Sequence, residues 1–199
     1  LWGNYALGGG IHQSTLQARE KTLALAARGG TRETADLDFL AAHRLGPLGV
    51  GLAGSYFRTG GYPIVRPDQR GAIDVAADSR NANFRIKLAH QPNKKTALAL
   101  HAGVFNEDRG NGTPLTENST NAGYVGGRAT LETAARGKWS LSGFAQIQEF
   151  ASVFSAQEED RSSELPALNQ FEVPSNALGG SLEWLQVLGG THLLTAGAD

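Results

Sequence analysis

Residues 81–90, NANFRIKLAH, alternate between apolar and polar side chains with a period of two. The apolar positions are Ala82, Phe84, Ile86 and Leu88, and the polar positions between them are Asn81, Asn83, Arg85 and Lys87. Successive side chains of a strand point to opposite faces of a sheet, whereas a helix would not separate these two sets. The stretch therefore predicts a β-strand with one apolar and one polar face.

The same alternation recurs along most of the chain. Further runs occupy residues 21–28, 35–41, 50–60, 96–106, 128–133, 138–148, 177–187 and 191–199. Together they predict about nine strands, many of them near the roughly 9–11 residues that a transmembrane strand needs. The predicted fold class is all-β, with an antiparallel sheet.

The connections between these runs are sorted by length. After the first hairpin, short connections at residues 45–49, 91–95 and 135–138 alternate with long ones at residues 61–80, 107–123 and 155–176. A soluble β-sandwich, such as a binding module, alternates just as well along its strands but has no reason to sort its loops. Outer-membrane barrels have tight periplasmic turns and long extracellular loops. The sorting therefore favours a transmembrane barrel, with the long connections outside the cell.

A barrel of this kind assigns a direction to each side chain. Lipid is expected on the apolar side, and Asn83 is expected to face the lumen. The lipid-facing predictions are Leu25, Phe84, Ile86 and Leu141. Aromatic girdles mark both membrane interfaces, and the girdle candidates are Trp139 and Trp184 near the short turns and Tyr56 near the other end.

Composition excludes several other classes. The 18 basic and 19 acidic side chains nearly balance, so bulk charge gives no attraction for nucleic acid, and the absence of cysteine excludes a disulfide framework. No apolar run approaches the roughly 20 residues of a membrane-spanning helix. Catalytic elbows, phosphate-binding loops and metal-ligand spacing of the five histidines are also missing from the sequence. The acidic run at 158–160 lacks the spaced oxygens of a calcium loop and is interpreted as solvated charge.

The first fifteen residues, LWGNYALGGGIHQST, resemble the end of the plug domain of TonB-dependent outer-membrane receptors. The matching positions are Leu1, Trp2, Gly3, Ala6, Leu7, Gly8 and Gly9. The resemblance implies that residues 1–18 end a plug domain and that residues 19–199 begin a transmembrane β-barrel of 22 strands. Because about nine strands are too few to enclose a plug, we expect the 199 residues to be part of a longer receptor.

What the resemblance implies for function is active transport without catalysis or a cofactor. Receptors of this family take up scarce nutrients, commonly ferric siderophores or cobalamin-like chelates, across the bacterial outer membrane. Their partners are outer-membrane lipid, the TonB complex and the small-molecule or metal-chelate ligand. A plain porin or autotransporter barrel, which would have no plug before its first strand, stays open as an alternative, as does the soluble β-sandwich.

One long connection contains candidate ligand-binding residues. Residues 61–71, GYPIVRPDQRG, place Tyr62, Arg66 and Arg70 beside two prolines that restrict the loop. Guanidinium groups beside an aromatic ring suit an anionic or catechol-like chelate through charge-assisted hydrogen bonds and stacking. The alternative interpretation is solvated loop charge.

Overall fold

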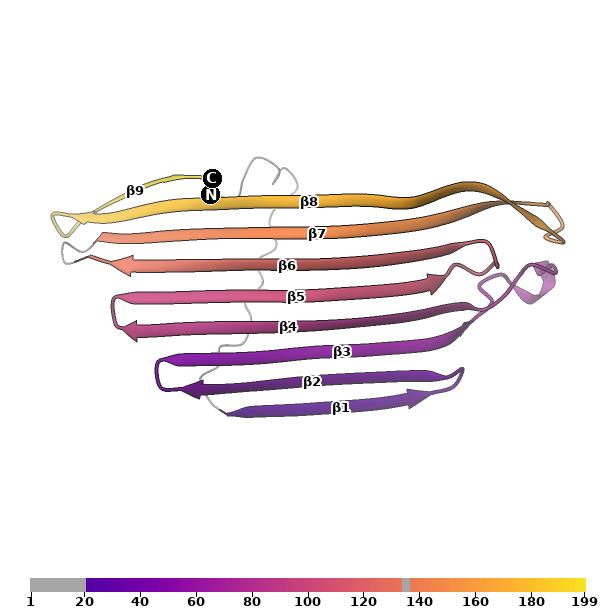
Figure 1. Ribbon diagram of the computed structural model, residues 1–199, viewed down its shortest axis with the longest axis horizontal. Helices are drawn as coiled ribbons and strands as arrows, with labels where there is room; N and C mark the ends of the chain where they lie inside the picture. Colours follow the sequence, from indigo (N-terminus) through magenta and orange to yellow (C-terminus); the bar gives the residue numbers. More distant parts are fainter. Residues whose placement is uncertain (1–20, 134–136) are drawn as a thin grey trace.

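The computed structural model describes residues 21–133 and 137–199. Within them, nine strands form one antiparallel sheet in which each strand lies beside its neighbours in sequence (Figure 1). The strands are β1 (Thr22–Gly30), β2 (Thr34–Leu45), β3 (Leu48–Tyr62), β4 (Ala77–Asn93), β5 (Thr96–Gly110), β6 (Glu117–Glu132), β7 (Gly137–Gln157), β8 (Glu164–Leu188) and β9 (His192–Ala198). The predicted all-β class and the predicted number of strands are confirmed for this part of the chain. The proposed plug residues 1–18 lie outside the described residues.

The predicted boundaries of the long connections are wrong. Residues 61–80, 107–123 and 155–176 were expected as loops, but the strands continue into them and leave only residues 63–76, 111–116 and 158–163 unpaired. The polar residues at the start of β6, ENSTNAG, pair with both β5 and β7. In the extensions of β5 and β6, residues 107–110 and 117–121, both faces are polar, so the sequence shows no alternation there. In the extension of β8, shifts in register interrupt the alternation of its apolar residues. The longer connections nevertheless still lie at one end of the sheet (Figure 1).

The turns at the opposite end are tight for local reasons. Gly46 adopts a φ of +59° between β2 and β3, a conformation that favours glycine. Between β4 and β5, the Asn93 side-chain oxygen accepts hydrogen bonds from the backbone N–H groups of Lys95 and Thr96, each at 2.9 Å. Asparagine commonly closes turns in this way. The predicted short connections at 45–49 and 91–95 therefore do contain turns, although the strands run further into them than expected.

Several rings in the sheet lie over glycines of the neighbouring strand. A Cβ on Gly103 would approach the Tyr124 ring to 2.7 Å, and one on Gly126 would approach His101 to 2.6 Å. The His101 and Tyr124 rings themselves are 6.0 Å apart. Phe39 covers Gly54 in the same manner on the other face. We call these pairs ring-over-glycine contacts, and they fill space that a larger residue would need.

The sheet has almost no conventional core. All nine strands belong to one sheet, so the described residues do not form the two packed sheets of a sandwich. Ile73 is the only buried hydrophobic side chain in the described ranges, at 7% exposure. Many large apolar side chains of the strands are exposed instead, as the next section describes.

Candidate functional site

One face of the sheet is apolar across its strands, including β9, where Leu194, Ala196 and Ala198 lie on that face. Residues that pair directly across strands point to the same face. One row of such partners is Leu25, Phe39, Gly54, Phe84, Val104, Gly123 and Ile147, and the adjacent row is Leu23, Ala41, Leu52, Ile86, Ala102, Val125, Ala145 and Leu178. We call this surface the apolar face. Exposure reaches 75% for Leu25 and 87% for Leu178.

Four side chains that were predicted to point in the same direction do lie on one face of the sheet. Leu25, Phe84 and Ile86 lie in the two rows above, and Leu141 lies on the same face through its pairing with Ala129. Asn83 alternates with Phe84 and therefore lies on the opposite face.

The apolar face has a defined edge at the end with the short turns. Trp139 and Trp184 pair directly across β7 and β8, with ring centroids 6.0 Å apart. From Trp139 to Ile147 the strand covers about 27 Å at about 3.4 Å per residue. This length matches the apolar band of about 25 Å that surrounds membrane barrels. Tyr56, the other predicted girdle residue, also lies on this face, opposite Leu37 and Ala82.

Polar pairs border the apolar face at the loop end. Asn106 donates a hydrogen bond to Asn121 across β5 and β6, at 2.6 Å. Next to them, the Arg80 guanidinium pairs with the Asp108 carboxylate at 2.8 Å. Both pairs continue the alternation of the apolar residues, so they share that face. The change from apolar to paired polar side chains sets the upper limit of the apolar band.

The opposite face is mainly polar, with Phe57, Phe105 and Phe144 among its residues, and several of its polar side chains bond to one another. Arg28 donates hydrogen bonds to Asp36 at 2.7 Å and Asp38 at 2.9 Å. Asn83 donates to Ser55, its cross-strand partner. We call this surface the polar face. It is chemically suited to contact water or other polar protein groups, whereas the apolar face is not.

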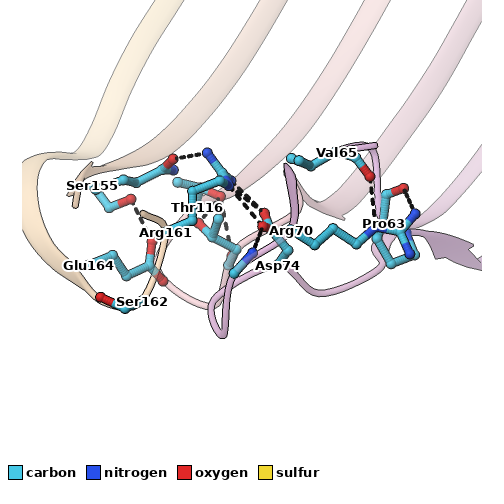
Figure 2. A network of polar contacts seen from close by, with 12 residues as sticks. Pro63, Val65, Arg70, Asp74, Thr116, Ser155, Arg161, Ser162 and Glu164 are labelled. Atoms are coloured by element: carbon cyan, nitrogen blue, oxygen red, sulfur yellow. Dashed lines mark hydrogen bonds and ion pairs between the residues drawn. The ribbon is translucent and has the colours of Figure 1, made fainter. Parts of the chain in front are cut away.

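At the loop end, connections that are far apart in sequence are held together by a buried ion pair (Figure 2). The Arg161 guanidinium donates to the Asp74 carboxylate at 2.5 and 2.8 Å, and the Asp74 side chain is only 1% exposed. The backbone N–H of Gly71 also donates to this carboxylate, at 2.8 Å. The hydrogen bonds from Arg161 hold the pKa of Asp74 below its ordinary value.

Two further contacts join the same loops. The Ile73 backbone N–H donates to the Arg161 carbonyl at 3.2 Å. Glu164 accepts hydrogen bonds from the Leu115 backbone N–H at 2.8 Å and from the Ser155 hydroxyl at 2.6 Å. Residues 63–76, 111–116 and 158–164 thus form one polar network, which we call the loop cluster (Figure 2).

Of the predicted ligand-binding residues, Arg66 and Arg70 lie within the loop cluster and Tyr62 ends β3 next to it, but they make separate contacts. Arg66 pairs with Asp68 at 2.7 Å, and Arg70 donates to the backbone carbonyl of Val65 at 2.7 Å. Tyr62 is 58% exposed, and the Arg32 guanidinium lies 4.9 Å from the centre of its ring. None of these contacts joins Tyr62, Arg66 and Arg70 to one another.

Sequence reasoning missed the residues that organise the loop end. Asp74 and Arg161 are 87 positions apart, so no local pattern connects them. Arg161 lies directly after the acidic run 158–160, which was interpreted as solvated charge. Gly71 is an indirect indication of this contact, because a Cβ there would collide with the Arg161 carbonyl. A single glycine in a loop does not, however, indicate which residue lies against it.

Comparison with protein-family models, curated proteins and solved structures gives no match. Among residues 21–133 and 137–199, no helix is long and apolar enough to cross a membrane. The same residues contain no group of three or more histidine, cysteine or acidic side chains that could hold a metal ion. The plug-like motif, Leu1 to Gly9, lies outside the described ranges.

Proposed function

We propose that the nine strands are part of the transmembrane barrel of an outer-membrane TonB-dependent receptor. Its cargo would be a scarce nutrient such as a ferric siderophore or a cobalamin-like chelate, and TonB would drive transport without catalysis by the receptor. The observation that carries the membrane location is the apolar face. A continuous surface of exposed leucine, phenylalanine and valine is unfavourable in water and is satisfied by lipid.

The geometry of the ends supports a barrel that crosses an outer membrane. The apolar band is about as tall as a hydrocarbon layer, it begins at a tryptophan pair, and the longer connections are gathered beyond its other edge. In lipid, every backbone N–H and C=O group needs a partner, so β1 and β9 would pair with further strands in a closed barrel.

The receptor class, as opposed to a plain porin, rests on the resemblance of residues 1–9 to a plug end. In this proposal the polar face contacts the plug and water inside the barrel, and outer-membrane lipid covers the apolar face. Tyr62, Arg66 and Arg70 remain candidates for contact with the cargo at the outer mouth.

Single cysteines test the membrane topology in the full-length protein on intact cells. Gln69 and Glu159 lie in the loop cluster, whereas Asn93 lies at a tight turn on the opposite end. Gln69→Cys and Glu159→Cys should react with a membrane-impermeant maleimide, and Asn93→Cys should react only after the outer membrane is broken. Equal labelling of all three on intact cells, or recovery of the protein in the soluble fraction, would contradict the proposal.

Transport is tested by uptake of radiolabelled ferric chelates or cobalamin into cells with and without TonB. A receptor should accumulate its cargo only when TonB is present. Passive entry that is independent of TonB would instead identify a porin.

A further inference from the structure

The hairpin formed by β7 and β8 reverses its polarity above the membrane band. Within the band, Gln146 and Gln148 occupy the polar face. Further along the same face, beyond residue 149, most of the paired positions are apolar: Phe150 with Val173, Phe154 with Leu168 and Ala156 with Leu165, with the polar pair of Ser152 and Gln170 between the first two. We call this surface, made by residues 150–156 and 165–173, the inner arm surface.

The inner arm surface is open to solvent. Phe154 is 48% exposed, Leu168 53% and Leu165 69%. Apolar side chains grouped in this way above the level of the lipid have no hydrocarbon to cover them, and such patches mark binding surfaces.

The loop cluster leaves most of this surface exposed, because its contacts with the end of the hairpin lie on the other face. Ser155 and Gln157 alternate with Phe154 and Ala156, and Gln157 pairs with Glu164. Glu164 bonds to Ser155, and Gln157 accepts a hydrogen bond from Arg161 at 2.7 Å. The face of the arm that carries Ser155 and Gln157 is therefore engaged by the loops, whereas Phe154, Leu165 and Leu168 on the inner arm surface stay exposed. Ser152, on that same surface, is buried and forms a hydrogen bond with Asn118 at 2.7 Å.

The tip of the hairpin sets the charge of a suitable ligand. Glu158, Glu159 and Asp160 follow the end of β7 and are exposed. The one basic residue of the tip, Arg161, is neutralised by Asp74. The apolar surface therefore ends at a tip with net negative charge, while Arg109 lies in the cross-strand row of Asn118 and Ser152 at the lower part of the surface.

From this combination we infer that the inner arm surface binds an amphipathic cation, a ligand that carries amines together with aromatic or branched aliphatic groups. Apolar groups would bury against Phe154, Leu165 and Leu168, and the amines would lie near the carboxylates of the tip. The inference rests on the proposed function for the position of the arm outside the lipid and for the role of this ligand as cargo. It narrows the cargo class toward positively charged chelates or peptides.

Fluorescence titration of the purified full-length protein in detergent tests the inference. The probe is the dansylated tetrapeptide amide Lys-Phe-Lys-Leu. Two comparison probes separate the contribution of charge from that of apolar contact. Gln-Phe-Gln-Leu lacks the positive charge of the lysines, and Lys-Ser-Lys-Ser lacks the apolar groups. We expect the first probe to bind at least about tenfold more tightly than either comparison probe, as loss of a buried side chain or of charge attraction implies.

Variants locate the site on the arm. Phe154→Ser and Leu168→Ser should each weaken binding of the first probe by about tenfold, and the double variant Glu158→Gln, Glu159→Gln should weaken it several-fold and remove its salt dependence. Leu193→Ser is the matched control, since Leu193 is an apolar residue of β9 with 64% exposure, and it should leave binding unchanged. Heat-modifiable migration in electrophoresis verifies that each variant is assembled.

The possible outcomes separate this inference from the proposed function. Equal binding of the neutral probe, or unchanged binding by both Phe154→Ser and Leu168→Ser, would overturn the amphipathic-cation site even if the protein labels as an outer-membrane receptor. Specific binding by a protein that fractionates as soluble would retain the site and overturn the receptor proposal.

Discussion

The body of the sheet and the loop cluster handle apolar and charged groups in opposite ways. In the body, leucine and phenylalanine side chains lie exposed along the apolar face, and Leu25 is 75% exposed. At the loop end, Ile73 is 7% exposed, Thr113 is 4% exposed and the Asp74 carboxylate is 1% exposed. The loops therefore bury side chains against one another, whereas most of the strands do not.

This difference identifies the medium that each region requires. A loop in water must supply its own partners for polar groups, and the loop cluster does so with backbone N–H groups and an ion pair. A sheet with its apolar side chains outside needs an external apolar phase to cover them. The two regions together are what we expect if, as proposed, the strands pass from hydrocarbon to water.

The largest expected effect comes from placing a charge on the apolar face in the body of the sheet. An arginine at Ile86, in the middle of the apolar band, should lower the free energy of unfolding in lipid vesicles by about 2–4 kcal/mol. The control is Asn83→Arg, three positions away on the polar face, which should cost far less. The measurement is a urea refolding titration, and equal losses at the two positions would mean that both faces are buried in protein.

The second prediction breaks the loop cluster. Arg161→Ala leaves the buried Asp74 carboxylate without its cation, so residues 63–76 should separate from residues 158–163. Limited digestion with proteinase K should then cut residues 63–76 several-fold faster. Arg66→Ala is the matched control, because the Arg66–Asp68 pair is exposed at 72% and 60% and should contribute little. Similar digestion of both variants would argue against a loop cluster that depends on this ion pair.

Low pH should weaken the contact between Asp74 and Arg161 less than the Arg161→Ala substitution does. The folded-state pKa of Asp74 is lowered by Arg161, so the stabilisation is present above the ordinary carboxyl pKa and is lost as the pH falls through the lowered value. We expect hydrogen exchange in residues 63–76, corrected for intrinsic rates, to increase below about pH 4. Asp74→Asn should remove this dependence; a pH profile that persists in this variant would assign it to another group.

The smallest expected effect tests whether the predicted ligand residues Tyr62, Arg66 and Arg70 contact the cargo. Tyr62 is exposed, whereas the charge of Arg66 is neutralised by Asp68. Tyr62→Ala should therefore lower uptake about two- to threefold, as loss of one aromatic contact implies, and Arg66→Ala should leave it nearly unchanged. Unchanged uptake in the triple variant Tyr62→Ala, Arg66→Ala, Arg70→Ala, with normal assembly, would remove this loop from the ligand site.

The sequence predicted the body of the sheet well because a strand with one apolar and one polar face leaves a local signal. The alternation of Phe84 and Ile86 with Asn83 and Arg85 is readable within ten residues, and the register extends it across neighbouring strands. The turns were also readable, since glycine and asparagine have strong conformational preferences.

The loop end was poorly predicted because its determinants are long-range. Strand extension at the start of β6 depends on pairing with β5 and β7 rather than on its own polar residues. The contact of Asp74 with Arg161 depends on how two hairpins meet. The reversal of polarity at Phe154 was hidden because the pairing of Phe154 with Leu168 follows a shift in register.

The ring-over-glycine contacts have a consequence for the way the sheet assembles. A slip of two residues keeps every side chain on its own face, so the contrast between the faces cannot prevent it. Such a slip would, however, move the Tyr124 ring from Gly103 onto His101 or Phe105, where a side chain already fills the space. Each glycine thus accepts the ring of the neighbouring strand in one register only. These contacts therefore select the correct register among those that the apolar and polar faces allow.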